Sequence, residues 1–239
     1  MKYAGIVKQS LVDYPGEIAA VLFTRGCNMR CPFCHNGELL VRSRDHKEQD
    51  LEEESIMEFL RKHHGFLDAV VFSGGEPSLY AQEGLIDNMR RVKEMGFKVK
   101  LDTNGTNSMW LEHLIEKNLI DYVAMDVKHV LDYRKYLQAV GSLSKQNFFH
   151  IRNSVTLLKS AEISVEFRTT VIPGLHEPEE VMEIARSIAG APLYTLQQFN
   201  PRKTLHPSWQ HIIPYSREQM ETMARHAELY VDEVRVLNI

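Results

Sequence analysis

The feature that most constrains the fold is a regular alternation of short apolar runs with helix-compatible segments. Six runs have the length and residue types of buried β-strands and recur about every 25–35 residues. They cover residues 18–24, 69–72, 97–101, 122–125, 164–171 and 193–199, and 234–237 is a candidate for a final strand. Strands that alternate with helices in this way form parallel βαβ units, so the sequence predicts an α/β fold with a parallel sheet.

No stretch of linker-like composition divides this alternation, and the chain has no short internal repeat. We therefore expect a single domain over residues 1–239, with a core at about 17–200 and a loop and helix over 201–239. Local features complete this reading. We expect a helix from after Pro77 to about Met95, a helix with Pro178 in its first turn, and a last helix capped by Ser216 with Gln219. Residues 3–7 suggest a short hairpin, and Asp50 with Glu53 matches a capping box that opens a helix to about residue 64.

Composition narrows the class of protein. Charged residues make up 25% of the chain and hydrophobic ones 44%, which excludes wholesale disorder. The net charge of −4 lacks the excess of positive charge that is typical of non-specific binding to nucleic acid. The opening residues lack the pattern of a signal peptide, and the apolar runs are too short to span a bilayer. We expect a cytoplasmic protein with neither a nucleic-acid nor a membrane partner.

Chemically unusual residues gather where the predicted strands end. They are Cys27, Cys31 and Cys34 after the first strand, Gly74, Gly75 and Glu76 after the second, Asp102 and Thr103 after the third, Asp126 and Lys128 after the fourth, Arg168 within the fifth and Asn200 after the sixth. The carboxyl ends of parallel strands meet at one edge of a sheet, where active sites of α/β proteins form. This edge is the predicted site.

The cysteines carry the strongest signal. All three cysteines of the chain lie within the eight residues from Cys27 to Cys34, which suits no disulfide framework. Three thiolates on one loop can hold three corners of a cubane iron–sulfur cluster, leaving one iron open to another ligand. The alternative is a zinc site with His35 as the fourth ligand. Since His35 directly follows Cys34, the two side chains converge poorly on one tetrahedral ion.

The spacing Cys27-x3-Cys31-x2-Cys34, with Phe33 before the last cysteine, resembles the signature of the radical S-adenosylmethionine (SAM) superfamily. More narrowly, the segments 26–36, 73–76, 102–105 and 126–128 resemble the glycyl-radical-enzyme activases, which include the pyruvate formate-lyase activating enzyme. The opening stretch 10–16 looks most like anaerobic ribonucleoside-triphosphate reductase activating proteins. The resemblance runs from about residue 5 to residue 200.

This resemblance implies a partial (β/α)6 barrel and one [4Fe–4S] cluster held by Cys27, Cys31 and Cys34. It implies that one electron cleaves SAM to methionine and a 5′-deoxyadenosyl radical, which takes a hydrogen atom from a glycine of a partner. The implied partner is a glycyl radical enzyme, with anaerobic ribonucleotide reductase the expected one. The implied electron donor is a protein such as flavodoxin or ferredoxin.

The resemblance also implies which side chains contact the cofactor: Phe33, His35, Gly74, Gly75, Glu76, Asp102, Thr103, Asp126, Lys128, Arg168 and Asn200. Within this set, Phe33 lies near the adenine and Glu76 accepts from the SAM amino group. Asp102, Asp126 and Thr103 help to hold a monovalent cation beside SAM. Asn200 departs from the pattern, because pyruvate formate-lyase activases usually carry a His there.

Structural interpretations stand beside these roles. The two glycines suit a tight strand-to-helix turn, the two aspartates suit helix capping, and Lys128 suits a surface side chain. A charged Arg168 in an apolar strand needs a partner if buried. His63, His64, His113, His129 and His150 are expected at the surface. The irregular loop with His206, Trp209 and His211 either closes over a partner segment or simply packs.

Two other functions remain open from the sequence. A radical SAM enzyme that modifies a small molecule would carry the same core motifs. A binding module stabilised by zinc or by a cluster would need only the cysteines. The chain has only about 40 residues after the predicted barrel, which leaves no second domain to enclose a small substrate and favours an open rim that faces a protein.

Overall fold

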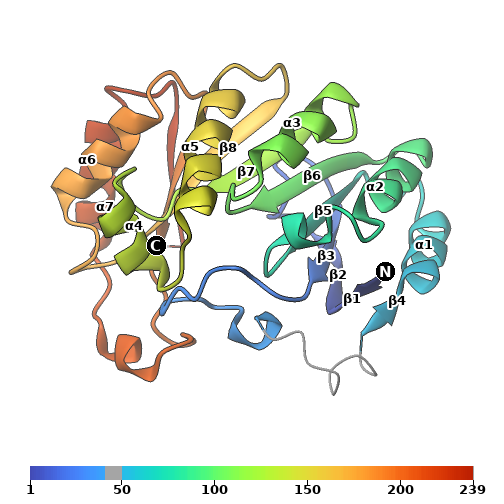
Figure 1. Ribbon diagram of the computed structural model, residues 1–239, viewed down its shortest axis with the longest axis horizontal. Helices are drawn as coiled ribbons and strands as arrows, with labels where there is room; N and C mark the ends of the chain where they lie inside the picture. Colours follow the sequence, from blue (N-terminus) through green and yellow to red (C-terminus); the bar gives the residue numbers. More distant parts are fainter. Residues whose placement is uncertain (41–49, 239) are drawn as a thin grey trace. The chain divides into compact units, whose positions relative to one another are not determined.

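The computed structural model describes residues 1–40 and 50–238. Figure 1 labels the strands and helices of the chain. The chain forms two compact units. The first comprises Met1–Asn28, Glu38–Thr103 and Met109–Val123, and the second comprises Met29–Gly37, Asn104–Ser108 and Ala124–Ile239. No helix among the described residues is both long and apolar enough to cross a membrane.

The strands and helices alternate through most of the chain. The strands are β1 (Lys2–Tyr3), β2 (Gly5–Ser10), β3 (Ala19–Thr24), β4 (Leu51–Glu52), β5 (Ala69–Gly74), β6 (Lys98–Thr103), β7 (Tyr122–Asp126), β8 (Ser164–Val171), β9 (Tyr194–Gln198) and β10 (Val234–Leu237). The α-helices are α1 (Glu53–Lys62), α2 (Leu85–Glu94), α3 (Ser108–Glu116), α4 (Tyr133–Val140), α5 (Lys145–Lys159), α6 (Pro178–Ser187) and α7 (Arg217–Ala227). Short 3-10 turns are η1 (Gly37–Leu39), η3 (Pro77–Tyr80) and η4 (Pro207–His211).

In the first unit, the strand order is β6-β5-β3-β2. Strands β3, β5 and β6 are parallel, and β2 runs antiparallel to β3. The apolar residues of β3 and β5 are almost wholly buried, as expected for strands covered on both faces. The start of β7 joins this unit next to β6, through the hydrogen bond from Asp121 N–H to the Val99 carbonyl (2.8 Å).

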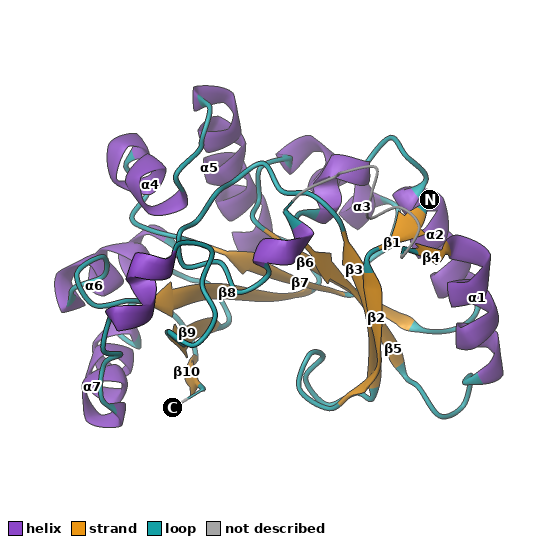
Figure 2. Cartoon of the chain, turned by 90° about the horizontal axis from the view of Figure 1, so that it is seen from below, coloured by secondary structure: helices purple, strands orange, loops and turns teal. Residues whose placement is uncertain are grey.

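In the second unit, β8, β9 and β10 follow one another in parallel. The Val127 N–H donates to the Arg168 carbonyl (2.8 Å), so the chain leaving β7 runs beside β8. Helices α6 and α7 pack against each other (Figure 2). The predicted α/β class with a mostly parallel sheet is confirmed, and β10 confirms the candidate final strand at 234–237.

Local sequence explains where several helices begin and end. Ser216 begins α7 through a capping box with Gln219, and the Pro178 predicted for a first helical turn opens α6. Asp132 accepts from the backbone of residues 134 and 135 and starts α4. Gly141 ends that helix in the left-handed conformation (φ +68°).

Three local predictions are wrong, and one helix was not predicted. Asp50 does not cap α1, since Glu52 occupies the N-cap and the Asp50 carboxylate pairs with Arg25 instead. Residues 3–7 form no hairpin, because β1 pairs with the distant β4 and β2 pairs with β3. The single helix expected from Pro77 to Met95 is divided into η3 and α2. Helix α4 was not anticipated.

Candidate functional site

The predicted site residues divide between the two units. Cys27, Gly74, Gly75, Glu76, Asp102 and Thr103 belong to the first unit, and Cys31, Phe33, Cys34, His35, Asp126, Lys128, Arg168 and Asn200 belong to the second. All three cysteines are free thiols. The geometry of each group is described within its own unit.

In the first unit, the residues before Cys27 are held by three distant segments. The Arg25 guanidinium pairs with the Asp50 carboxylate, and both side chains are largely buried. The Tyr80 hydroxyl donates to the Arg25 carbonyl (2.9 Å), and the Gly26 N–H donates to the Leu39 carbonyl (2.5 Å). The start of the cysteine loop is therefore a rigid part of this unit.

The two glycines of the Gly-Gly-Glu motif pack directly against this segment. A Cβ on Gly74 would lie 2.3 Å from the Thr24 nitrogen, and one on Gly75 would lie 1.9 Å from the Gly26 oxygen. The Gly75 N–H donates to the Thr24 carbonyl (3.0 Å) and the Glu76 N–H to the Gly26 carbonyl (2.8 Å). Only glycine allows such an approach of two backbones, so the motif has a structural role in supporting the residues before Cys27.

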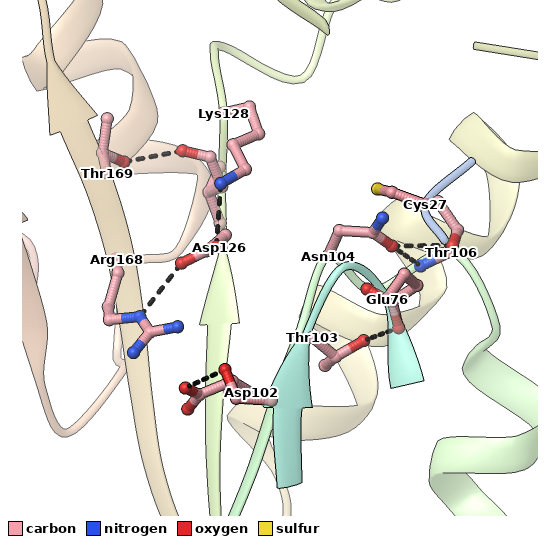
Figure 3. A network of polar contacts seen from close by, with 12 residues as sticks. Cys27, Glu76, Asp102, Thr103, Asn104, Thr106, Asp126, Lys128, Arg168 and Thr169 are labelled. Carbon is pink, nitrogen blue, oxygen red and sulfur yellow. Dashed lines mark hydrogen bonds and ion pairs between the residues drawn. The ribbon is translucent and has the colours of Figure 1, made fainter. Parts of the chain in front are cut away.

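Glu76 is almost fully buried at the end of this motif. Its Oε1 accepts from the Ser78 N–H (3.1 Å) and from the Thr103 hydroxyl (2.8 Å; Figure 3). The first bond caps η3 and the second ties the end of β5 to the end of β6. Two predicted site residues, Glu76 and Thr103, are thus in direct contact.

Asp102 lies within β6 and caps no helix, because α3 begins six residues later. Its Oδ2 accepts from the Ser73 hydroxyl (2.9 Å), and its Oδ1 lies 3.1 Å from the ammonium nitrogen of Lys100. Lys100 was not considered in the sequence analysis. The sequence did contain a signal, since a lysine between Val99 and Leu101 in a buried strand needs a partner, as does Arg168 within β8.

In the second unit, the rest of the cysteine loop is held between two segments. The Arg30 N–H donates to the Val140 carbonyl at the end of α4 (2.8 Å). A Cβ on Gly141 would lie 2.7 Å from the Arg30 oxygen, so this contact also requires glycine. Within the loop, the Cys34 N–H donates to the Cys31 carbonyl (3.0 Å).

The second segment is the irregular stretch that includes η4. The His206 N–H donates to the Pro32 carbonyl (2.9 Å), and the rings of Phe33 and Trp209 lie 5.8 Å apart. Phe33 is buried in this contact. His206 and Trp209 therefore pack on the cysteine loop, and closure of this stretch over a partner segment stays a prediction.

Asp126, Lys128 and Arg168 form one ion-pair cluster (Figure 3). The Lys128 ammonium lies 2.8 Å from Asp126 Oδ2, and Arg168 Nε lies 3.0 Å from Oδ1. Burial opposes ionisation of Asp126, but the charges of Arg168 and Lys128 outweigh it and lower its pKa to about 2. Burial likewise disfavours the charged form of Lys128, but Asp126 and Cys31 reverse this and raise its pKa. Lys128 is not the surface side chain of the alternative interpretation.

Two residues that the sequence analysis missed hold the backbone of Lys128. Its N–H donates to the Tyr136 hydroxyl (3.0 Å), and its carbonyl accepts from His176 Nε2 (2.9 Å). Nδ1 of His176 in turn accepts from the Ile172 N–H (3.2 Å). Burial lowers the pKa of His176 to about 4. His129, expected at the surface, is buried beside it with ring centroids 5.1 Å apart.

His35 and Asn200 lie close to each other in the second unit. The ring centroids of His35 and Phe199 are 6.4 Å apart. Burial lowers the pKa of His35, and the nearby Asn200 backbone acts in the opposite direction. The side-chain oxygen of Asn200 accepts from the Arg202 N–H (3.0 Å), which forms a local turn.

Among residues 1–40 and 50–238, no three or more His, Cys, Asp or Glu side chains form a group that could hold a metal ion. The case for a metal centre therefore rests on donor chemistry. Three free thiols in a short loop suit an iron–sulfur cluster, whose ligands are normally cysteine sulfurs.

Comparisons with known proteins agree with these motifs. The family model described as "Radical SAM superfamily" matches residues 21–188. A protein of Methanocaldococcus jannaschii named as a glycyl-radical enzyme activating enzyme is 35% identical over 243 residues, which covers 99% of this chain and 95% of the relative. The pyruvate formate-lyase-activating enzyme of Clostridium pasteurianum is 30% identical over 179 residues, covering 73% of this chain and 70% of that enzyme.

A solved structure shares the fold. The crystal structure of Streptococcus suis SuiB superposes with a TM-score of 0.67 at 12% identity, over 92% of this chain. The chain spans about half of SuiB, since the match covers 49% of that protein. At this identity the likeness concerns the fold alone.

Proposed function

This chain belongs to the radical SAM superfamily and, within it, to the glycyl-radical enzyme activating enzymes, and from this premise we propose its partner and its site. The family implies SAM and a [4Fe–4S] cluster. We propose that the partner is an anaerobic ribonucleoside-triphosphate reductase, that residues 1–239 act as one domain, and that a flavodoxin or ferredoxin supplies electrons. The opening segment from Ser10 to Gly16 is the feature that favours this partner over other glycyl radical enzymes.

The observation that carries the proposal is the loop with three free thiols, Cys27, Cys31 and Cys34. In the proposal these thiols hold three irons of the cluster. When bound, the cluster supplies one electron that cleaves SAM to methionine and a deoxyadenosyl radical, which takes a hydrogen atom from the target glycine. The protein itself has to orient SAM and exclude water, because this chemistry comes from the cofactors.

The strand-end residues then hold SAM. Lys128 and Arg168 are positively charged and are positioned by Asp126, so they are suited to bind the SAM carboxylate. Glu76 is suited to accept from the SAM amino group, and Phe33 to pack near the adenine. Asn200 offers an amide donor and acceptor but no charge where related activases carry a His. Gly74 and Gly75 let their backbone approach the segment that precedes Cys27.

The resemblance to the activases also implies a monovalent cation at Asp102, Thr103 and Asp126. The residues present do not fit such an ion well. Asp102 is paired with Lys100, and Asp126 is paired with both Lys128 and Arg168. Each carboxylate therefore already has a side-chain cation, and the proposal assigns no step to a bound metal cation.

The proposed activity is tested by mixing the reduced, cluster-loaded chain with SAM and an anaerobic ribonucleotide reductase in the absence of oxygen. We expect a glycyl radical signal in electron paramagnetic resonance, and deuterium from the glycine Cα in the 5′-deoxyadenosine formed. If no glycyl radical enzyme gains a radical while a metabolite labels the deoxyadenosine, the enzyme acts on a small molecule. If only another glycyl radical enzyme responds, the partner is wrong but the reaction class holds.

The metal centre is tested separately with two variants from the same loop. Anaerobically reconstituted protein should contain about four irons and four sulfides per chain, and Cys31→Ala should lose them. His35→Ala should keep them, because in the proposal only the cysteine thiols hold the cluster. Stoichiometric zinc without sulfide, or loss of metal on changing His35 alone in a folded chain, contradicts the cluster assignment.

A further inference from the structure

We propose that the ammonium group of Lys100 is a built-in cation that replaces a monovalent metal ion beside Asp102, so that this chain binds SAM without added Na⁺ or K⁺. The inference rests on the proposed function, in which Asp102 and Asp126 belong to the SAM site. It concerns Lys100, to which neither the sequence motifs nor the family comparison gives a role.

In the first unit, Lys100 is buried and its ammonium group has three partners. Its side chain is only 3% exposed within β6. The ammonium lies 3.1 Å from Asp102 Oδ1, donates to the Asp13 carbonyl (2.5 Å) and lies 5.4 Å from the ring centroid of Tyr122. A lysine is rarely buried this deeply unless it is paired, and here the pairing partner is the carboxylate of a predicted site residue.

The ligands of the ammonium group are those that an alkali ion would use. A carboxylate oxygen and a backbone carbonyl oxygen are both oxygen donors of the kind that replace the hydration shell of K⁺. The carbonyl comes from the turn at Ser10–Asp13, where the Ser10 hydroxyl donates to the Asp13 carboxylate (2.5 Å) and accepts from the Asp13 N–H (3.2 Å). This closed turn fixes the position of the Asp13 carbonyl. Lys100 thus occupies a prepared oxygen environment.

The negative charges of Asp102 and Asp126 are both balanced by side-chain cations. In the first unit, Lys100 neutralises Asp102, whose other oxygen accepts from the Ser73 hydroxyl. In the second unit, Asp126 has two cationic partners, Lys128 and Arg168. A metal ion placed on either carboxylate would approach an ammonium or guanidinium group of the same sign, which disfavours its binding. Both carboxylates are therefore compensated by the protein itself.

The test measures SAM affinity of the cluster-loaded protein in buffers that contain either KCl or tetramethylammonium chloride at equal ionic strength. The wild type should bind SAM equally in both, within about twofold. Lys100→Met, which keeps the length of the side chain but not its charge, should lose on the order of tenfold in tetramethylammonium and recover in KCl. Lys98→Met is the matched control, since Lys98 lies on the same strand but is 55% exposed, and it should behave as the wild type.

A second readout does not depend on SAM. KCl should raise the melting temperature of Lys100→Met above its value in tetramethylammonium chloride, because K⁺ would bind the vacated oxygen environment, and it should leave the wild type unchanged. If Lys100→Met does not fold, the proposal is tested by comparing SAM binding and the melting temperature of the wild type in KCl and in tetramethylammonium chloride. A wild type that requires Na⁺ or K⁺ for SAM binding or for thermal stability overturns the proposal.

The outcomes also separate this proposal from the proposed function. A cluster-loaded wild type that binds no SAM in any buffer refutes the proposed site. In that case the melting temperatures still report whether Lys100 excludes K⁺: a shift confined to Lys100→Met supports the built-in cation, and a shift in the wild type contradicts it.

Discussion

The ends of β6 and β7 carry the same pair of residue types in opposite order. At the end of β6 the lysine precedes the aspartate, as Lys100-Leu-Asp102, and at the end of β7 it follows, as Asp126-Val-Lys128. In an extended chain, residues two apart share a face, so both orders bring the ammonium to the carboxylate. The distances are similar, at 3.1 and 2.8 Å.

The order decides how deep the lysine lies. Lys100 is set back within its strand and is 3% exposed, whereas Lys128 lies beyond the last strand residue and is 17% exposed. The pair at β7 includes a second cation, Arg168. The lysine that precedes its aspartate is therefore buried within the strand, while the lysine that follows its aspartate keeps part of its side chain exposed.

The largest expected difference between the two lysine–aspartate pairs is in their contribution to the free energy of unfolding. Lys100→Met in buffer free of alkali ions should lower the free energy of unfolding by about 3 kcal/mol, because removing one partner of a buried ion pair is strongly destabilising. Lys128→Met should cost only about 1 kcal/mol, since its pair is more exposed and Arg168 remains beside Asp126. Urea unfolding followed by fluorescence measures both. Equal losses for the two variants would contradict the difference in depth.

A second prediction uses pH, and it concerns the β7 end alone. The carbonyl of Lys128 accepts from His176, whose pKa is lowered from 6.5 to about 4. Between these values the unfolded chain binds more protons than the folded chain, so stability is full above pH 6.5 and falls as pH decreases toward 4. For His176 this amounts to about 2 kcal/mol between pH 7.5 and 5.

The measurement is the difference in unfolding free energy between pH 7.5 and pH 5. His176→Gln should show a loss smaller by about 2 kcal/mol than the wild type, because the amide does not titrate in this range. His113→Gln, at the end of α3 in the first unit, is the control and should keep the wild-type loss. An unchanged pH dependence in His176→Gln would mean that the buried imidazole is not a source of acid sensitivity.

The smallest of these effects concerns ligand binding at the β7 end. Asp126→Asn should weaken SAM binding by about tenfold, equivalent to about 1.4 kcal/mol, because Lys128 and Arg168 lose the carboxylate that orients them. Equilibrium binding to the cluster-loaded protein measures this, with circular dichroism to confirm that the variant is folded. If SAM affinity does not change, Asp126 has no part in the site and the distinction between the two strand ends fails.

Patterns that are local in sequence were enough to predict much of this protein. The alternation of apolar and helical segments predicted the α/β class, because periodicity and burial are linked within each element. The donor set of Cys27, Cys31 and Cys34 was read from spacing alone, since three thiols in one loop need no long-range information, and it stays a prediction. The Ser216 cap and the helix that opens at Pro178 were likewise correct, because a cap and its helix are adjacent in the chain.

The tertiary structure decided which partner each polar side chain takes. Asp50 looked like a helix cap, but the buried Arg25 from 25 residues earlier takes its carboxylate. His129 looked like a surface residue, and packing against His176 buries it. The carboxylate partner of Lys100 is Asp102, two residues away, but its other two partners, the Asp13 carbonyl and the Tyr122 ring, come from distant segments. Sequence periodicity reports which face of an element is buried, but the counter-charge of a buried group depends on segments that meet only in the folded chain.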